Sequence, residues 1–280
     1  MQINILTLDL EDWYLSYDSS QIPVEKWHLL ESRIEGNTEI FLDLLKHNQI
    51  KATFFVLGWI AQRFPGLIRK IISAGHEIGY HSFTHQLPVK QGRVAFEDDL
   101  VKGLGLLENI SGQKVKYYRA PMFSLCSGSA WVIPVLLKHG IQVSSSYKAF
   151  KPFNNHAIPR LPFLFDYSGM QLLEMPLNRV NLSGFKLVYS GSGYFRLMPL
   201  FLLMHFFERN DYNMTYFHPR DFDANVPSTK LLPAYRNFLN TLGNRHTGAK
   251  LGKLMKKHAF VSIGDALKQI DVKALPVVKI

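Results

Sequence analysis

Short apolar runs alternate along this chain with segments whose apolar positions are spaced by three and four. A continuous apolar run of about four to eight residues is typical of a buried strand, and the wider spacing is typical of a helix. Strands are predicted at residues 3–8, 52–57, 75–80, 117–119, 142–145, 214–217 and 259–263, helices at 38–46, 65–74, 96–107, 130–139 and 197–209 and in a stretch near the C-terminus, and a hairpin-like region at 158–177. Repeated strand–helix units of this length predict an α/β fold with one parallel barrel.

The composition agrees with a single domain over residues 1–280. No low-complexity tract, internal repeat or Gly/Ser linker divides the sequence, and 47% of its residues are hydrophobic. A chain of this length can bury a large core without disulfides. Cys126 is the one cysteine, so no intrachain disulfide can form, which fits a reducing compartment.

The first apolar run is a predicted strand rather than a signal peptide, since no charged segment and cleavage site accompany it. The longest apolar stretch, residues 197–207, is interrupted by Pro199 and His205. It is too short to cross about 30 Å of hydrocarbon. We therefore expect a cytoplasmic protein without a transmembrane helix.

His81 and His85 are the most informative residues for chemistry. In a helix or tight helical turn, residues four apart share one face, so both imidazoles could reach a divalent ion at about 2.0–2.1 Å. A zinc-protease HExxH helix is excluded because Ser82, not glutamate, follows His81. The spacing alone is equally compatible with two solvated histidines.

Carboxylates follow the first predicted strand, and their position favours a metal site over two solvated histidines. Residues 3–8 lead into Asp9, Glu11 and Asp12, and residues 75–80 lead into His81. The carboxyl ends of parallel strands meet at one edge, where active sites of α/β folds collect. Two histidines and one carboxylate would leave an open coordination position, as in catalytic zinc sites.

At these positions the chain resembles the polysaccharide deacetylases with a NodB-type domain (carbohydrate esterase family 4), in particular a subgroup associated with bacterial exopolysaccharide and capsule loci. The resemblance implies an irregular barrel of about seven parallel strands and metal-dependent N-deacetylation. It rests on five motifs in the family's order: LTLDLEDW at 6–13, HEIGYHSFTH at 76–85, YYRAPMF at 117–123, GSGYFR at 191–196 and YFHPRDFD at 216–223.

The resemblance implies a role for each of the acidic and histidine residues. Asp9 occupies the position of the general base, and His81 and His85 would bind one divalent ion, Zn²⁺ first, with Co²⁺, Ni²⁺ or Mn²⁺ as other options. Strand alternation favours Glu11 as the third ligand, because it shares a face with Asp9. The subgroup's motif favours Asp12, which we prefer at this stage, and both remain open.

The later motifs supply the other catalytic groups that the resemblance implies. His218 would protonate the leaving amine, and Arg119 would keep Asp9 ionised. Pro121 would fix the turn after the arginine, and the amide of Met122 would donate to the oxyanion.

Substrate contacts are expected from aromatic residues in the motif loops. Trp13 and Tyr194 could stack on sugar rings, near Pro121. The sequence departs from the family where an aspartate normally tunes the acid histidine, since Ser144 stands there. Glu174 or Asp221 is expected to replace it.

The net charge of +10 and the pI near 9.5 are not explained by the catalytic motifs and require an explanation of their own. No nucleic-acid-binding module or dense basic run is present, so no nucleic acid is expected. One reading is a solvated basic face; the other is attraction to an anionic membrane or a diphosphate-bearing substrate. Lysines at helical spacing beside apolar residues suggest a basic interfacial helix: Lys250, Lys253, Lys256 and Lys257.

Together these features predict a metal-dependent enzyme that removes N-acetyl groups from an N-acetylated sugar of a bacterial surface polysaccharide or its lipid-linked precursor. Its location would be the cytoplasm, with the inner face of the membrane as one site of action. Two alternatives are an amide hydrolase on a non-sugar substrate and a degenerate glycan-binding protein that has lost catalysis.

Overall fold

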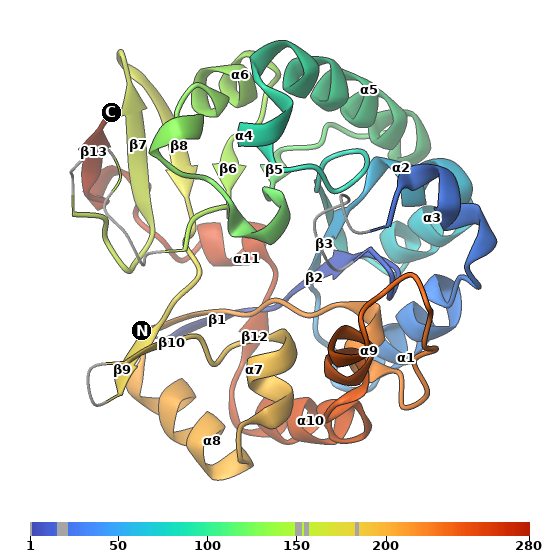
Figure 1. Ribbon diagram of the computed structural model, residues 1–280. Coiled ribbons are helices and arrows are strands. Elements are labelled where there is room, and N and C mark those ends of the chain that lie inside the picture. The colour runs from blue at the N-terminus through green and yellow to red at the C-terminus, as the bar shows by residue number, and fades with distance from the viewer. Residues whose placement is uncertain (1, 16–21, 149–152, 154–156, 183–184) are drawn as a thin grey trace.

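Parallel strands form the framework of the protein, and helices surround them (Figure 1). The computed structural model describes residues 2–15, 22–148, 153, 157–182 and 185–280. The strands are β1 (Ile3–Ile5), β2 (Thr7–Leu10), β3 (Thr53–Val56), β4 (Glu77–Tyr80), β5 (Tyr117–Tyr118), β6 (Val143–Ser144), β7 (Phe163–Tyr167), β8 (Met170–Glu174), β9 (Val180–Leu182), β10 (Phe185–Leu187), β11 (Tyr212–Met214), β12 (Phe260–Val261) and β13 (Val277–Lys279).

The helices lie mostly between successive strands in the sequence, as the alternating pattern predicts. The α-helices are α1 (Ile34–His47), α2 (Gly58–Arg63), α3 (Pro65–Ser73), α4 (Pro88–Gln91), α5 (Arg93–Ser111), α6 (Val132–Lys138), α7 (Ser192–Leu197), α8 (Leu200–Arg209), α9 (Ala234–Thr241), α10 (Thr247–Lys257) and α11 (Ile263–Leu267). Short 3₁₀ helices are η1 (Val24–Leu29), η2 (Pro121–Phe123), η3 (Ser127–Ser129), η4 (Pro219–Phe222), η5 (Asn244–His246) and η6 (Val272–Ala274).

The largest sheet has the order β13-β7-β8-β6-β5-β4-β3-β2, and a second sheet has the order β11-β1-β12. Strands β2 to β6 are parallel to their neighbours, and β7 and β8 form an antiparallel hairpin. Because β1 leads directly into β2, the two sheets continue into one another and build an irregular, mostly parallel barrel. The predicted fold class and the predicted hairpin are therefore confirmed.

Two predicted elements are each divided in the structure, and the predicted strand 214–217 is observed earlier in the chain, as β11 at Tyr212–Met214. The predicted strand 3–8 is divided, because β1 pairs with β11 and β12 while β2 pairs with β3. The predicted helix 197–209 is also divided: α7 ends at Leu197, and α8 begins after Pro199. Proline lacks the N–H that a continuous helix would require, so it begins a new helix instead.

Local sequence accounts for other helix ends. Pro65 opens α3, where its fixed φ suits the first turn. Gly112 ends α5 with a φ of 70°, a left-handed conformation that costs glycine little.

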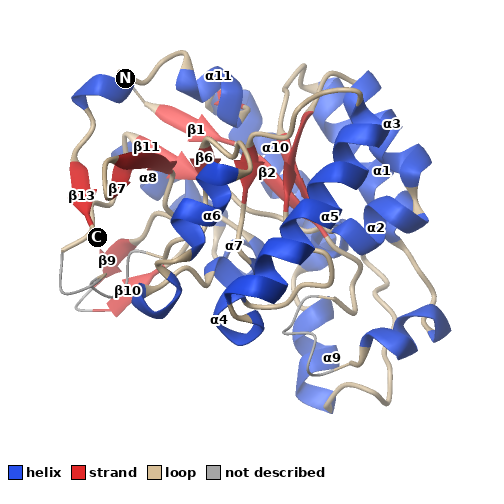
Figure 2. Ribbon diagram, turned by 90° about the horizontal axis from the view of Figure 1, so that it is seen from above, coloured by secondary structure: helices blue, strands red, loops and turns tan. Residues whose placement is uncertain are grey.

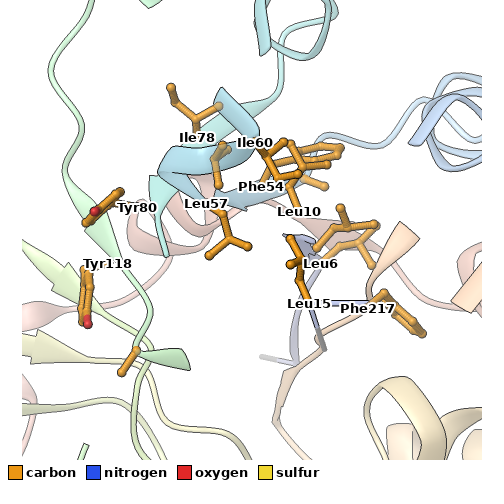
Figure 3. Close-up of a cluster of buried hydrophobic side chains, with 14 of the residues drawn as sticks. Leu6, Leu10, Leu15, Phe54, Leu57, Ile60, Ile78, Tyr80, Tyr118 and Phe217 are labelled. Carbon is orange, nitrogen blue, oxygen red and sulfur yellow. The ribbon is translucent and has the colours of Figure 1, made fainter. Parts of the chain in front are cut away.

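The core lies between the barrel strands and the surrounding helices. Figure 3 shows one part of it, where Leu6, Leu10, Phe54 and Phe217 are fully buried. The same cluster continues to Val278, so it joins both halves of the sequence. Truncating such a leucine to alanine typically costs about 2–5 kcal/mol. Among the described helices, none has the length and apolar character needed to span a bilayer.

Candidate metal and catalytic site

Strand register brings the distant polar residues of the sequence to one edge. The backbone amides of His81, Arg119 and Ser145 each donate to the last carbonyl of the neighbouring strand, at 3.0, 2.9 and 2.9 Å. These residues therefore stand on one rung, directly beyond β4, β5 and β6. Asp9 and Glu11, at the end of β2, meet them at the same edge, as the sequence predicts.

Glu11 lies between the two histidines. Its Oε1 is 2.9 Å from Nε2 of His81 and 2.9 Å from Nε2 of His85. All three side chains are almost completely buried. They form a group whose ligand atoms lie within 4.8 Å of one another, and a second such group combines Glu11 with Asp9 and His218.

The two histidines do not sit on a helix, and the predicted helical turn is wrong. Residues 81–87 form a loop in which Ser82 and His85 have φ values of 68° and 58°. Asp99 holds this loop by accepting a hydrogen bond from the Phe83 amide at 3.0 Å. The two positive φ values turn the loop so that His85 returns toward His81, and the centroids of the two imidazole rings lie 5.3 Å apart.

The tautomer of His81 follows from its partners. Its Nδ1 lies 2.8 Å from the carbonyl oxygen of Arg119, which can only accept, so Nδ1 carries the proton. Nε2 then directs its lone pair toward Glu11. Metal-binding histidines are commonly oriented in this way, with the other ring nitrogen donating to a carbonyl or carboxylate.

The donor set fits a divalent metal ion. Two imidazole nitrogens and a carboxylate oxygen face one another, and each is an acceptor that a cation would satisfy. The second oxygen of Glu11, Oε2, is buried and has no hydrogen-bond partner in the described part of the chain. Burial raises the pKa of Glu11, but His85, His218 and His81 lower it, and the net result is well below its usual value. Glu11 is thus a carboxylate held among cationic or metal-binding groups.

Asp12 lies outside this cluster, so the preference for it as a ligand does not agree with the geometry. Its Oδ2 accepts from the Ser32 hydroxyl at 2.5 Å, and its Oδ1 accepts from the amides of Trp13 and Arg33 at 2.9 and 3.3 Å. Burial raises the pKa of Asp12 despite these bonds. The side-chain alternation along β2 places Glu11, not Asp12, beside Asp9.

Arg119 is completely buried against Asp9. Its Nη1 donates to Asp9 Oδ1 at 2.6 Å and to Thr7 Oγ1 at 2.7 Å, and its Nη2 donates to Ser145 Oγ at 3.0 Å. The guanidinium also covers the Phe55 ring at 4.0 Å. Asp9 Oδ2 is 4.0 Å from His81 Nε2, next to the candidate metal site.

His218 approaches from the opposite side. Its Nε2 is 3.9 Å from Glu11 Oε2, and its Nδ1 is 3.3 Å from Asp221 Oδ2. Asp221 also accepts from the backbone amide of His218 at 2.9 Å. Burial raises the pKa of Asp221, but Arg196 and His218 lower it to a net value below the usual one. Of the two expected partners, Asp221 is therefore the one that contacts the histidine.

Glu174, the other expected partner of His218, lies beside the segment 144–147. Its Oε1 accepts from the amides of Ser146 and Tyr147 at 2.8 and 2.9 Å, close to the hydroxyls of Ser144 and Ser146. Burial raises its pKa to about 7, with hydrogen bonds opposing the shift. Glu174 therefore lies beside Ser144, where the family's aspartate is expected, and backbone amides rather than His218 hold its bonded oxygen.

A cavity of about 250 Å³ opens above these groups. Asp9, Glu11, His85 and His218 line it, together with Met122 and Tyr194 from the list of expected residues and Lys148, Arg220, Phe123, Ser192 and Tyr216. A larger cavity of about 550 Å³ lies between α1 and α3, but the candidate metal groups do not border it. Chemistry rather than size identifies the site.

Four expected substrate or turn residues have different environments. Tyr194 is 52% exposed at the cavity, as stacking would require, and Met122 adopts a left-handed φ of 59° at its rim. Trp13 is buried, its indole N–H donates to the Glu31 carbonyl at 3.0 Å, and its ring packs on Tyr14, so the expected sugar contact is wrong. Pro121 is buried at the start of η2 and does not line the cavity.

Sequence reasoning missed Lys148 and Arg220. Arg220 lies 3.9 Å from Glu11 Oε2, and Lys148 sits over the Phe123 ring at 5.8 Å. Burial lowers the pKa of Lys148. Arg220 belongs to the same motif as His218, which was a usable signal; Lys148 follows a predicted strand end without any motif.

Two family profiles match the chain. Residues 8–143 match the polysaccharide deacetylase family, and residues 145–268 match a domain of unknown function. A peptidoglycan-N-acetylglucosamine deacetylase of Bacillus cereus is 34% identical over 84 residues, which are 30% of this chain and 30% of that protein. A peptidoglycan deacetylase of Helicobacter pylori is 31% identical over 114 residues, 40% of this chain and 38% of that protein. The chain thus spans about a third of the length of these relatives.

Solved structures share the fold at low sequence identity. A Mycobacterium smegmatis protein assigned as a polysaccharide deacetylase superposes with a TM-score of 0.67 at 17% identity, covering 99% of this chain and 93% of that one. An allantoinase superposes with a TM-score of 0.60 at 13% identity, covering 95% and 89%. The fold shared with these structures therefore extends over nearly the whole chain, including the part that the second profile matches.

Proposed function

Because residues 8–143 place this chain in the polysaccharide deacetylase family, we propose that it is a metal-dependent hydrolase that removes N-acetyl groups from a glycan. The proposed substrate is an N-acetylated sugar of a bacterial surface polysaccharide or of its lipid-linked precursor. The observation that carries the proposal is the buried group of Glu11, His81 and His85 beside the Asp9–Arg119 pair. The order of the five sequence motifs and the similarity to peptidoglycan deacetylases support the substrate class.

In this proposal Glu11, His81 and His85 hold one divalent ion, with Zn²⁺ favoured by the two-nitrogen, one-oxygen donor set. Such an ion would make a bound water more acidic and would polarise the acetyl carbonyl. The carbonyl of Arg119 keeps His81 in the tautomer that exposes Nε2.

Asp9 accepts the proton of the attacking water at its Oδ2. Its other oxygen, Oδ1, is occupied by Arg119 at 2.6 Å, so the free oxygen faces the cavity region near His81. The buried guanidinium holds the carboxylate of Asp9 in this orientation. A base of this kind typically contributes about 10²–10⁴ in rate.

His218 donates a proton to the departing amine. Asp221 orients the imidazole by accepting at 3.3 Å from Nδ1, which leaves Nε2 directed at the cavity. The N-acetyl group would lie between Asp9 and His218, where the amide of Met122 is the proposed oxyanion donor. Tyr194, half-exposed at the cavity, is the proposed sugar-stacking residue.

We further propose that residues 1–280 act as one catalytic domain. Buried side chains from both profile regions, such as Leu8 and Phe217, belong to one cluster. The single cysteine, Cys126, supports a reducing compartment such as the cytoplasm. Amide hydrolysis of a non-sugar substrate is the second candidate, favoured by the shared fold with an allantoinase.

Metal analysis of the purified protein, together with acetate release from a panel of N-acetylated glycans, tests the proposal. We expect about one divalent ion per chain and acetate release that stops when the ion is chelated. Glu11→Gln and His85→Ala should lose the ion and the activity together. Asp12→Asn is the matched control, since the same loop loses a carboxylate that faces away, and it should keep the ion.

A chain that binds no divalent ion would refute the metal-dependent proposal. Metal binding without acetate release from any glycan would instead favour a binding protein or the non-sugar amide hydrolase. Loss of the ion in Asp12→Asn but not in Glu11→Gln would reverse the ligand assignment.

A further inference from the structure

Helix α9 carries its apolar residues on the outside. Tyr235, Phe238 and Leu239 are 57%, 60% and 40% exposed, and with the half-buried Leu242 they follow the spacing i, i+3, i+4, i+7. In a surface helix this stripe normally faces the core. In α9 the one buried residue is polar, Asn240.

The inverted orientation is held by hydrogen bonds rather than by apolar packing. The Asn237 side chain accepts from the Thr229 amide at 3.1 Å and donates to the Thr229 carbonyl at 2.9 Å. The guanidinium of Arg196 donates to the carbonyls of Leu239 and Asn240, each at 3.0 Å. These hydrogen bonds hold the side of α9 that carries Asn237 and Asn240 against the protein, so the apolar side faces outward.

The position of α9 relates this face to the cavity. Figure 2 shows α9 at one extremity of the molecule. Arg196 belongs to α7, the helix whose Tyr194 lines the cavity, and it also pairs with Asp221 at 3.4 Å.

The segment of sequence that contains α9 carries only basic charge. Residues 224–264 contain seven lysines and arginines and no aspartate or glutamate. Of the seven, Lys230 and Arg245 are exposed on either side of α9 in the sequence, and Arg236 lies within the helix. An exposed apolar helix face bordered by cations is the pattern of an interfacial helix on an anionic lipid surface.

The lysine cluster that the sequence suggested for this role is less suitable. Lys250 is half-buried and donates to the carbonyls of Arg196 and Met198 at 2.7 and 2.9 Å. Lys257 pairs with Glu208. Lys253 and Lys256 are exposed on α10, but the apolar residues beside them, such as Leu251 and Leu254, are buried in the core.

We propose that the outward face of α9, formed by Tyr235, Phe238 and Leu239 and bordered by basic residues, docks the protein peripherally on an anionic lipid surface. A second copy of the chain is a poorer partner, because the basic borders would face one another without any acid to balance them. A glycan is a poorer partner, because leucine and phenylalanine offer no hydrogen bonds to sugar hydroxyls. This inference goes beyond the proposed deacetylation and does not depend on it.

Vesicle co-sedimentation of the full chain tests the proposal without any turnover. The probes are vesicles of phosphatidylcholine alone and of phosphatidylcholine mixed with phosphatidylglycerol. We expect the wild type to sediment with the anionic vesicles only, and Phe238→Glu to weaken this binding about tenfold or more, since one buried phenylalanine is lost from the lipid contact. The double variant Lys230→Gln, Arg245→Gln should weaken it and reduce its sensitivity to salt.

Val94→Glu is the matched control, because Val94 is 77% exposed on α5 and the same charge is added there. It should sediment like the wild type. Equal binding of Phe238→Glu and wild type, equal sedimentation with neutral and anionic vesicles, or no sedimentation would overturn the proposal. A wild-type dimer that Phe238→Glu dissociates in analytical ultracentrifugation, or a loss of kcat/KM on a soluble glycan in this variant, would assign the face to a second copy or to the glycan instead.

Discussion

Glu174 should make the stability of this protein depend on pH in an unusual direction. It is a fully buried carboxyl whose pKa burial raises to about 7 from a usual value of 4.5. Its Oε1 accepts hydrogen bonds from two backbone amides, and its Oε2 has no hydrogen-bond partner among the described residues. Glu174→Gln keeps the acceptor and removes the charge.

The sign follows from which state binds the proton. Between pH 4.5 and about 7 the folded protein holds a proton on Glu174 that the unfolded chain has released, so stability is greatest below this window and falls as the pH rises through it. At about 1.4 kcal/mol per pKa unit, the wild type should lose about 2–3 kcal/mol between pH 5 and pH 8 through this group alone. The glutamine variant lacks this loss.

Urea unfolding followed by tryptophan fluorescence at pH 5, 6, 7 and 8 measures the effect. The free energy of unfolding of Glu174→Gln, minus that of the wild type, should rise by about 2–3 kcal/mol across this range. Other titrating groups are common to both proteins and cancel in the difference. In the control Asp265→Asn, hydrogen bonding by Lys268 lowers the pKa of the replaced carboxyl below its usual value, so this group is ionised in both states from pH 5 to pH 8 and its difference should stay constant. A difference for Glu174→Gln that does not change with pH would refute the reasoning.

Three further predictions concern the site. Asp9→Asn should keep the metal ion, measured by metal analysis, but lower kcat about 10²-fold or more in an acetate-release assay, because its free oxygen no longer takes the water's proton; normal turnover would rule out the base. Asp221→Asn should keep the ion and lower kcat, because His218 loses the carboxylate that orients it. In the double variant with His218→Ala, kcat should be no lower than in His218→Ala alone; a further decrease would contradict a role through His218. Asp12→Asn should lower the free energy of unfolding by about 1–3 kcal/mol, seen in urea titration, because its carboxylate bonds the Ser32 hydroxyl and two amides; an unchanged midpoint would contradict this structural role.

The sequence predicted the framework of the site because parallel register is a strong constraint. Once residues 3–8 and 75–80 were assigned as strands, Asp9 and His81 had to meet at one edge. The alternation of side chains along β2 also pointed to Glu11. The family's motif pointed to Asp12 instead, and the Ser32 hydroxyl that holds Asp12 is twenty residues away, where no local pattern could reveal it.

Other features depend on tertiary contacts that no local rule includes. His85 adopts a left-handed φ, which is uncommon for a residue other than glycine. The sequence therefore predicted correctly that His81 and His85 lie together, but it assigned their proximity to a helical turn instead of this loop. Trp13 stands in a motif loop but is buried against Tyr14, because the loop folds inward. The outward apolar face of α9 reads in the sequence as an ordinary amphipathic helix, since the direction of the face is set by Arg196 from another helix.

Arg119 serves both halves of the site through two different parts of one residue. Its carbonyl fixes the ring of His81, and its guanidinium fixes Asp9. The backbone contact survives any side-chain replacement, whereas the second contact does not. In the proposed mechanism, a single substitution at position 119 therefore removes the contact that fixes Asp9 and leaves the contact that fixes His81. Proton transfer and ion binding are separable at this one residue, so the proposed enzyme would lie one mutation away from a protein that binds an ion without catalysis.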